Sequence, residues 1–106
     1  MRREVVERLV RTGLVDDRRY AETRASALAE RGAGNDRIRY ELVFAGVEDD
    51  VAHAAIQSLA TEAERAQRIV DRRGASAKTA RYLAGKGFPD DVVHAVIALQ
   101  RDEALG

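Results

Sequence analysis

ELVFAGVEDDVAHAAI, residues 41–56, aligns without a gap on YLAGKGFPDDVVHAVI, residues 82–97, at a spacing of 41 residues. The matched identities are Leu42 with Leu83, Gly46 with Gly87, Asp49–Asp50 with Asp90–Asp91, Val51 with Val92, His53 with His94, Ala54 with Ala95 and Ile56 with Ile97. Repeated units of this size bury their hydrophobic faces against neighbouring units rather than alone. The stretch therefore predicts a tandem array of similar units.

The apolar residues outside this stretch follow the 3.6-residue period of helices, and most of the eight glycines stand where such a pattern stops. Helices are predicted at residues 2–12, 16–31, 35–45, 49–60, 62–73, 76–86 and 90–104. Sustained alternation of polar and β-branched residues, which would indicate strands, is missing from the sequence. The predicted fold class is all-α, with three helices in each unit.

The composition narrows the class of protein further. The 106 residues contain no cysteine, and 18 basic residues balance 18 acidic ones. A disulfide framework and a thiolate metal site are thereby excluded, and overall charge does not favour nucleic acid. We expect neither a signal peptide nor a membrane span, since the first residues lack a long apolar run and the sequence has no stretch of roughly 20 apolar residues. We expect a cytoplasmic protein without contact with a membrane.

The acidic and histidine motifs have structural interpretations. The pattern Gly–apolar–x–Asp–Asp occurs at 13–17, 46–50 and 87–91, where a glycine ends one helix and aspartates favour the positive end of the next. His53 and His94 occupy equivalent repeat positions without a second ligand at helical spacing, so no metal site is predicted. We expect no catalytic residues, no cofactor and no small-molecule substrate.

The basic residues concentrate in two stretches. Between residues 65 and 86 stand seven cations against a single acidic residue, and residues 18–39 hold six arginines against three acidic residues. Folding would gather these cations on one side, formed by the first two helices of each unit. They would make either a salt-bridged, solvated surface or a binding surface for carboxylates and phosphates, which arginine suits equally.

The helix predicted at 35–45 has apolar residues on two sides. One stripe consists of Ile38, Leu42 and Ala45, and the other consists of Tyr40, Val43, Phe44 and Val47. Residues two apart on a helix point about 200° from each other, so a single core cannot take both stripes. The second stripe is expected to pack on an adjacent repeat or, as the less favoured alternative, on a partner.

Several motifs together resemble the RecX family. They are Gly13-Leu14-Val15-Asp16-Asp17 followed by Tyr20-Ala21, then Arg31-Gly32-Ala33-Gly34, Arg37-Ile38, Glu41-Leu42 and Gly46-Val47, and finally Lys78 with Arg81-Tyr82-Leu83 and Gly87-Phe88. The order and spacing of these motifs cover nearly the whole chain. The resemblance implies an elongated, curved array. The internal repeat predicts its division into residues 1–13, expected to be the last helix of an incomplete first repeat, then 14–60 and 61–106.

The resemblance also implies a function. RecX-like proteins bind the filament of the RecA recombinase on DNA, restrain its activity in homologous recombination, DNA repair and the SOS response, and in some cases touch DNA weakly themselves. The residues that we predict to contact the partner or DNA are Arg24, Arg31, Arg37, Arg39, Arg68, Arg72, Arg73, Lys78 and Arg81. A helical DNA-binding module that acts without a recombinase is one alternative, and an interaction domain that uses the Tyr40 and Phe44 stripe is another.

Overall fold

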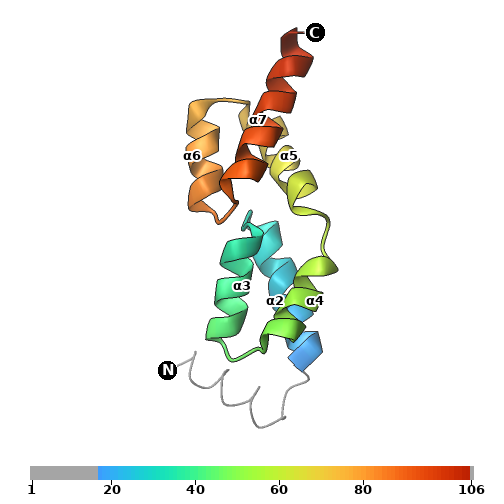
Figure 1. The fold of residues 1–106 in the computed structure, drawn as a ribbon. Coiled ribbons are helices and arrows are strands. Elements are labelled where there is room, and N and C mark those ends of the chain that lie inside the picture. The colour runs from blue at the N-terminus through green and yellow to red at the C-terminus, as the bar shows by residue number, and fades with distance from the viewer. Residues whose placement is uncertain (1–16, 106) are drawn as a thin grey trace. The chain divides into compact units, whose positions relative to one another are not determined.

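The computed structural model describes residues 17–105, with side chains described for residues 17–99, and this part of the chain contains helices and no strand (Figure 1). The helices are α2 (Asp17–Glu30), α3 (Asn35–Phe44), α4 (Asp49–Gln57), α5 (Glu62–Arg73), α6 (Ala77–Gly85) and α7 (Asp90–Leu105). The predicted all-α class is confirmed, and each segment predicted within this range has its helix. The helix predicted at 2–12 lies outside the described residues.

Local hydrogen bonds explain where α4 ends and α5 begins. The Ser58 hydroxyl donates to the carbonyl oxygen of Ala55 at 2.7 Å, at the end of α4. Thr61 then caps α5, because its hydroxyl accepts the N–H of Glu64 at 3.1 Å while the Glu64 carboxylate accepts the N–H of Thr61 at 3.1 Å. This capping box fixes Thr61 outside the helix. The segment predicted to run to residue 60 therefore stops at Gln57.

The described residues form two compact units, which are treated separately. Unit 1 contains residues 17–31 and 38–59, and unit 2 contains residues 32–37 and 60–105. The predicted division at residue 60 follows the sequence repeat, whereas residues 32–37 group with unit 2 by contact. The boundaries of the sequence repeats, at residues 14–60 and 61–106, therefore stay a prediction, because the compact units are divided differently.

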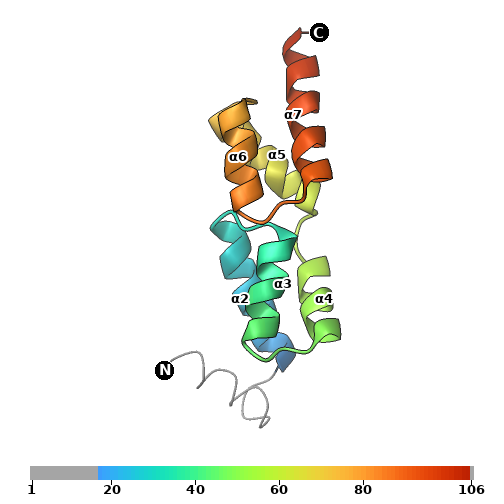
Figure 2. The ribbon, with the colours of Figure 1, turned by 60° about the vertical axis from the view of Figure 1, so that its left-hand side comes forward.

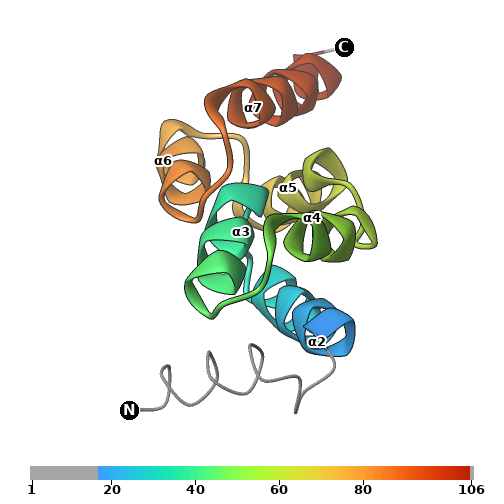
Figure 3. The ribbon, with the colours of Figure 1, turned by 60° about the horizontal axis from the view of Figure 1, so that its bottom comes forward.

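Small residues allow the helices of unit 1 to approach closely. Helix α2 packs against α4 (Figure 3), and the buried positions on both helices are mostly alanines. Ile38 and Leu42 from α3 are fully buried and are the largest such side chains of this unit. Short side chains bring helix axes together, while Ile38 and Leu42 bury larger apolar side chains.

Unit 2 has a more conventional hydrophobic core. Helices α5 and α6 each pack against α7 (Figure 2). The buried residues of this core are Ala66, Ile69, Val70, Leu83, Phe88, Val93 and Val96. On α5 and α7 they recur at spacings of three or four residues, so one face of each of these two helices is apolar, as the sequence pattern predicts, while α6 contributes Leu83.

Candidate partner-binding surface

The nine predicted contact residues lie on or beside four helices. Arg24 is in α2 and Arg31 follows it, while the others are Arg37 and Arg39 in α3, Arg68, Arg72 and Arg73 in α5, and Lys78 and Arg81 in α6. All have exposed side chains except Arg24, which is half-buried. Exposed cations can contact a partner, and several of them also contact neighbouring side chains of this chain.

In unit 1, two of these arginines interact with neighbouring side chains. A guanidinium nitrogen of Arg24 lies 4.0 Å from a carboxylate oxygen of Glu41. An Nη atom of Arg39 lies 3.4 Å from Nδ1 of His53, which accepts the hydrogen bond in the neutral tautomer that carries its proton on Nε2. Both pairs sit at the surface, where ion pairs and hydrogen bonds contribute little to stability. These arginines are held in place without being removed from solvent.

In unit 2, two cations converge on one aromatic ring. The guanidinium carbon of Arg73 stacks 3.6 Å from the centre of the Tyr82 ring, and the ammonium nitrogen of Lys86 lies 5.9 Å from the same centre. We call these three residues the Tyr82 cluster. Stacking on the ring orients the guanidinium while its N–H donors remain at the edge, available to an oxygen acceptor.

Further cations surround this cluster along α6. Lys78, Tyr82 and Lys86 are spaced one helical turn apart, so they line the same side of the helix. An Nη atom of Arg37 donates to the carbonyl oxygen of Gly85 at 3.4 Å, which holds this arginine at the end of α6. The structure therefore brings together Arg37, Arg73 and Lys78 from the predicted set, with Tyr82 and Lys86 added.

Arg65 does not belong to the basic surface, although the charge pattern placed it there. Its side chain is 8% exposed, and it donates to the carbonyl oxygens of Ala60 and Ala33, each at 2.9 Å, and to the side chain of Asn35. Burial lowers the pKa of Arg65, and the nearby Glu62 carboxylate opposes that shift. Sequence periodicity did not reveal this because two of the three partners, Ala33 and Asn35, lie 32 and 30 residues away in the sequence.

The second apolar stripe of α3 has an exposed part and a buried part. Val47 is 2% exposed and is among the buried apolar residues, so it is not available to a separate partner, and its expected packing on an adjacent repeat stays a prediction. Tyr40, by contrast, is 62% exposed, and its ring stacks with Phe44 at 5.7 Å between centres. The turn after α3 redirects the chain, which is why Val47 faces inward although the helical pattern assigns it to the outer stripe.

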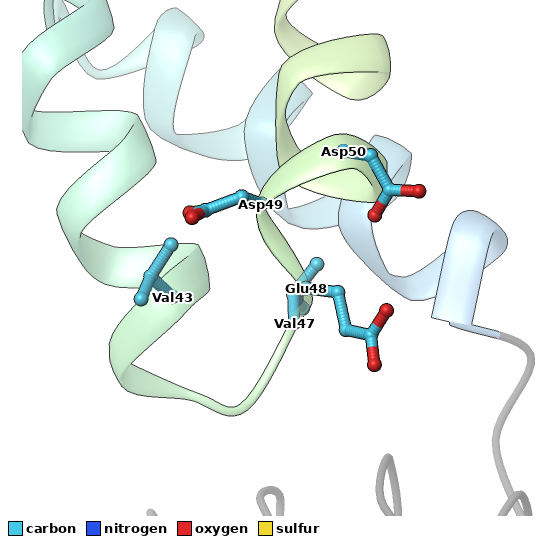
Figure 4. A pocket seen from close by; sticks show the side chains of 5 residues that line it. All are labelled: Val43, Val47, Glu48, Asp49 and Asp50. Carbon is cyan, nitrogen blue, oxygen red and sulfur yellow. The ribbon is translucent and has the colours of Figure 1, made fainter.

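An open depression of about 600 Å³ lies beside this turn (Figure 4). Its lining residues are Val43, Val47, Glu48, Asp49 and Asp50. The Asp49 carboxylate projects on the side of Val43, and that of Asp50 projects away from it (Figure 4). The depression thus combines apolar surface with three acidic side chains.

The aspartate pairs of α4 and α7 stand in the first turns of these helices, as predicted. Asp50 accepts the N–H of Val51 at 2.9 Å, so its carboxylate serves the helix start. The earliest copy of the motif lies largely outside the described residues.

Within residues 17–99, His53 and His94 are exposed, and no group of three His, Cys, Asp or Glu side chains is placed to hold a metal ion. None of the helices described is long and apolar enough to cross a membrane.

These features define a class of protein built from three-helix units with exposed cations. Comparison with known proteins narrows that class. A family model described as "RecX, second three-helix domain" matches residues 16–56. The chain is 34% identical to Regulatory protein RecX of Halorhodospira halophila, over 89% of this chain and 65% of that protein. Proteins of the same name from Trichlorobacter lovleyi and Chromohalobacter salexigens are 29% and 33% identical, over 85% and 87% of this chain and 68% and 67% of their own lengths.

The chain therefore belongs to the RecX family of regulatory proteins. It spans about two thirds of the length of these relatives. No solved structure gives a significant match.

Proposed function

We propose that this protein binds the RecA–DNA filament in the cytoplasm and inhibits the recombinase by binding, without catalysis of its own. The observation that carries the proposal is the Tyr82 cluster, in which Arg73 and Lys86 converge on one ring beside further exposed cations of α6. Membership of a family of regulatory proteins supports an action on another protein.

The chemistry of these cations fits such a filament. A protein–DNA filament offers both carboxylates and phosphates, and an oriented guanidinium can donate two parallel hydrogen bonds to either group. The zero net charge of the whole chain limits nonspecific attraction to DNA. The proposal therefore assigns binding to local surfaces: the nine predicted residues, with Tyr82 and Lys86 added.

The test is the rate of ATP hydrolysis by RecA filaments on single-stranded DNA, measured while the concentration of this chain is raised. The proposal expects a fall that depends on concentration and reaches a plateau when the filament is saturated. A hydrolysis rate that stays constant at concentrations well above that of the filament would contradict the inhibition.

Direct DNA binding without a recombinase is the second candidate, favoured by the row of Lys78 and Tyr82 on α6 and Lys86 directly after it. Basic side chains interleaved with an aromatic ring are typical of surfaces that bind single strands. Here fluorescence anisotropy of labelled single-stranded DNA should rise with the chain alone and fall steeply with salt. Binding that is undetectable at low salt would exclude this candidate and leave the first one untouched.

A further inference from the structure

Tyr82 is restrained by several contacts inside unit 2. Its ring is half-buried and packs against the hydrophobic core of this unit. The hydroxyl end lies beside the backbone of Gly32, because a Cβ on that glycine would be 3.6 Å from the phenolic oxygen and 3.5 Å from Cε of Lys86. All three residues belong to unit 2, so the direction of the ring is set within one compact unit.

Arg73 covers one face of this ring. Its guanidinium carbon lies 3.6 Å from the ring centre, which is the separation of groups in direct contact. Arg73 is the last residue of α5, and the N–H of Gly74, whose φ is +94°, donates to the carbonyl oxygen of Val70 at 2.7 Å. The chain therefore leaves the helix directly after Arg73, and both the backbone and the ring restrain this arginine.

Two neighbouring cations are not restrained by the ring in the same way. The ammonium nitrogen of Lys86 lies 5.9 Å from the ring centre, near the outer limit of about 6 Å for this attraction. Arg72 is exposed, and adjacent residues on a helix point about 100° apart, so Arg72 leaves α5 in a different direction from Arg73. Arg73 is therefore the cation whose orientation depends most directly on Tyr82.

A partner would meet this arginine rather than the ring beneath it. The side chain of Arg73 is exposed, and stacking leaves the N–H donors of its planar guanidinium at the edge. An exposed arginine without such a restraint loses rotamer freedom when it binds, whereas one that is already held in place has less freedom to lose. The ring thus favours binding through the arginine that it orients.

We propose that Tyr82 is a positioning residue, which acts on filament binding through Arg73 by holding the guanidinium in the conformation that receives an anionic group of the partner. This inference rests on the proposed function. It gives Tyr82 a role different from that of the exposed cations around it, which contact the partner themselves.

The test is a double-mutant cycle on the dissociation constant of the fluorescently labelled full chain for preformed RecA filaments on single-stranded DNA. Tyr82→Leu removes the ring but keeps an apolar side chain against the core, and it should weaken binding about fivefold. In the Arg73→Gln background the same change should weaken binding by less than about twofold, because the arginine that the ring orients is gone. In the Arg72→Gln background, which is the matched control, the full effect should persist.

Conservative variants separate orientation from folding. Tyr82→Phe keeps the ring and should bind like the unmodified chain. Arg73→Lys keeps the charge but not the planar fork, and it should weaken binding about fivefold, whereas Arg72→Lys should change it by less than about twofold. Because Arg72 and Arg73 are exposed, these two variants test the role of orientation without disturbing the core.

NMR of the chain alone supplies a reading that needs no partner. The Hε resonance of Arg73 should be shifted upfield by the ring, relative to that of Arg72, in the unmodified chain and in Tyr82→Phe. This shift should disappear in Tyr82→Leu.

The outcomes separate this inference from the function on which it rests. Equal effects of Tyr82→Leu in all three backgrounds would overturn the positioning role, as would wild-type affinity of Arg73→Lys or an unshifted Arg73 Hε resonance. An unmodified chain that shows the shifted resonance but does not bind the filament would instead overturn the proposed function, and this inference with it.

Discussion

Among single residues, Arg65 shows how a cation in a basic stretch can be structural. Its guanidinium satisfies two backbone carbonyls and the Asn35 side chain inside unit 2, and it is nearly inaccessible to solvent. Buried carbonyl groups without a donor are costly, so the arginine ties residues 33–35 to the start of α5. Arg68, one turn further along the same helix, is exposed.

Replacing Arg65 is therefore expected to destabilise the protein, and replacing Arg68 is not. Arg65→Met should lower the free energy of unfolding by about 3 kcal/mol, because buried acceptors lose their donors. Arg68→Met should change it by less than about 0.5 kcal/mol, as is usual for exposed positions. Urea denaturation followed by circular dichroism measures both. Equal effects of the two variants would contradict the assignment of Arg65 to the interior.

Gly85 is a glycine inside a helix that has no evident steric need for it. It is the last residue of α6, its φ is not positive, and a Cβ there would meet nothing within 4 Å. Gly85→Ala should therefore stabilise the protein by up to about 1 kcal/mol, by reducing the freedom of the unfolded chain. Thermal unfolding would show a higher midpoint, and a lower midpoint would mean that the conformation of α6 requires glycine.

At the level of helices, the residues that end and begin helices predicted the number and order of the described helices. Glycines and first-turn aspartates identified the helix ends, since capping is a local effect that residues reveal by themselves. The end of α4 was predicted three residues too late, because the capping box of Thr61 and Glu64 outweighs the helical pattern. The grouping of residues 32–37 with unit 2 could not be predicted, because it depends on contacts with distant residues.

Glu62 links the start of α3 to α5 and gives this junction a pH dependence. Its carboxylate accepts the N–H of Asn35 at 2.7 Å. Burial nevertheless raises the pKa of Glu62 above its ordinary value of 4.5, although the Asn35 hydrogen bond and Arg65 oppose that rise. A carboxyl with a raised pKa in the folded state favours folding while it is protonated, and this contribution disappears as pH rises through the folded pKa.

The stability of wild type relative to Glu62→Gln should therefore fall as pH rises from below 4.5 through the folded pKa. Urea denaturation of both proteins across this window measures the difference, since other titrating groups are common to both. NMR titration of the Glu62 carboxyl should give a midpoint above 4.5. A midpoint at or below 4.5 would contradict the conclusion that burial dominates the pKa shift of Glu62. A stability of wild type relative to Glu62→Gln that rises with pH would contradict it as well.

At the scale of the whole molecule, the charge pattern predicted a basic surface on α5 and α6 but not the stacking of Arg73 on Tyr82 within it. Arg73, Lys78 and Arg81 were predicted from the concentration of cations, and all are exposed. The stacking of Arg73 on Tyr82 joins two helices, so no single-helix pattern contains it. Lys86 was counted in the basic stretch but not in the predicted contact set, although it stands four residues after Tyr82, a spacing that places the two side chains on the same side.

The central claim is that these cations bind the RecA–DNA filament, and the most direct measurement is the dissociation constant of the fluorescently labelled chain on preformed filaments. The variant that combines Arg73→Glu, Lys78→Glu and Arg81→Glu should bind about tenfold more weakly or worse, while its helix content stays unchanged. Arg18→Glu, an exposed arginine outside the predicted set, should bind like wild type. Wild-type affinity of the triple variant would contradict the account.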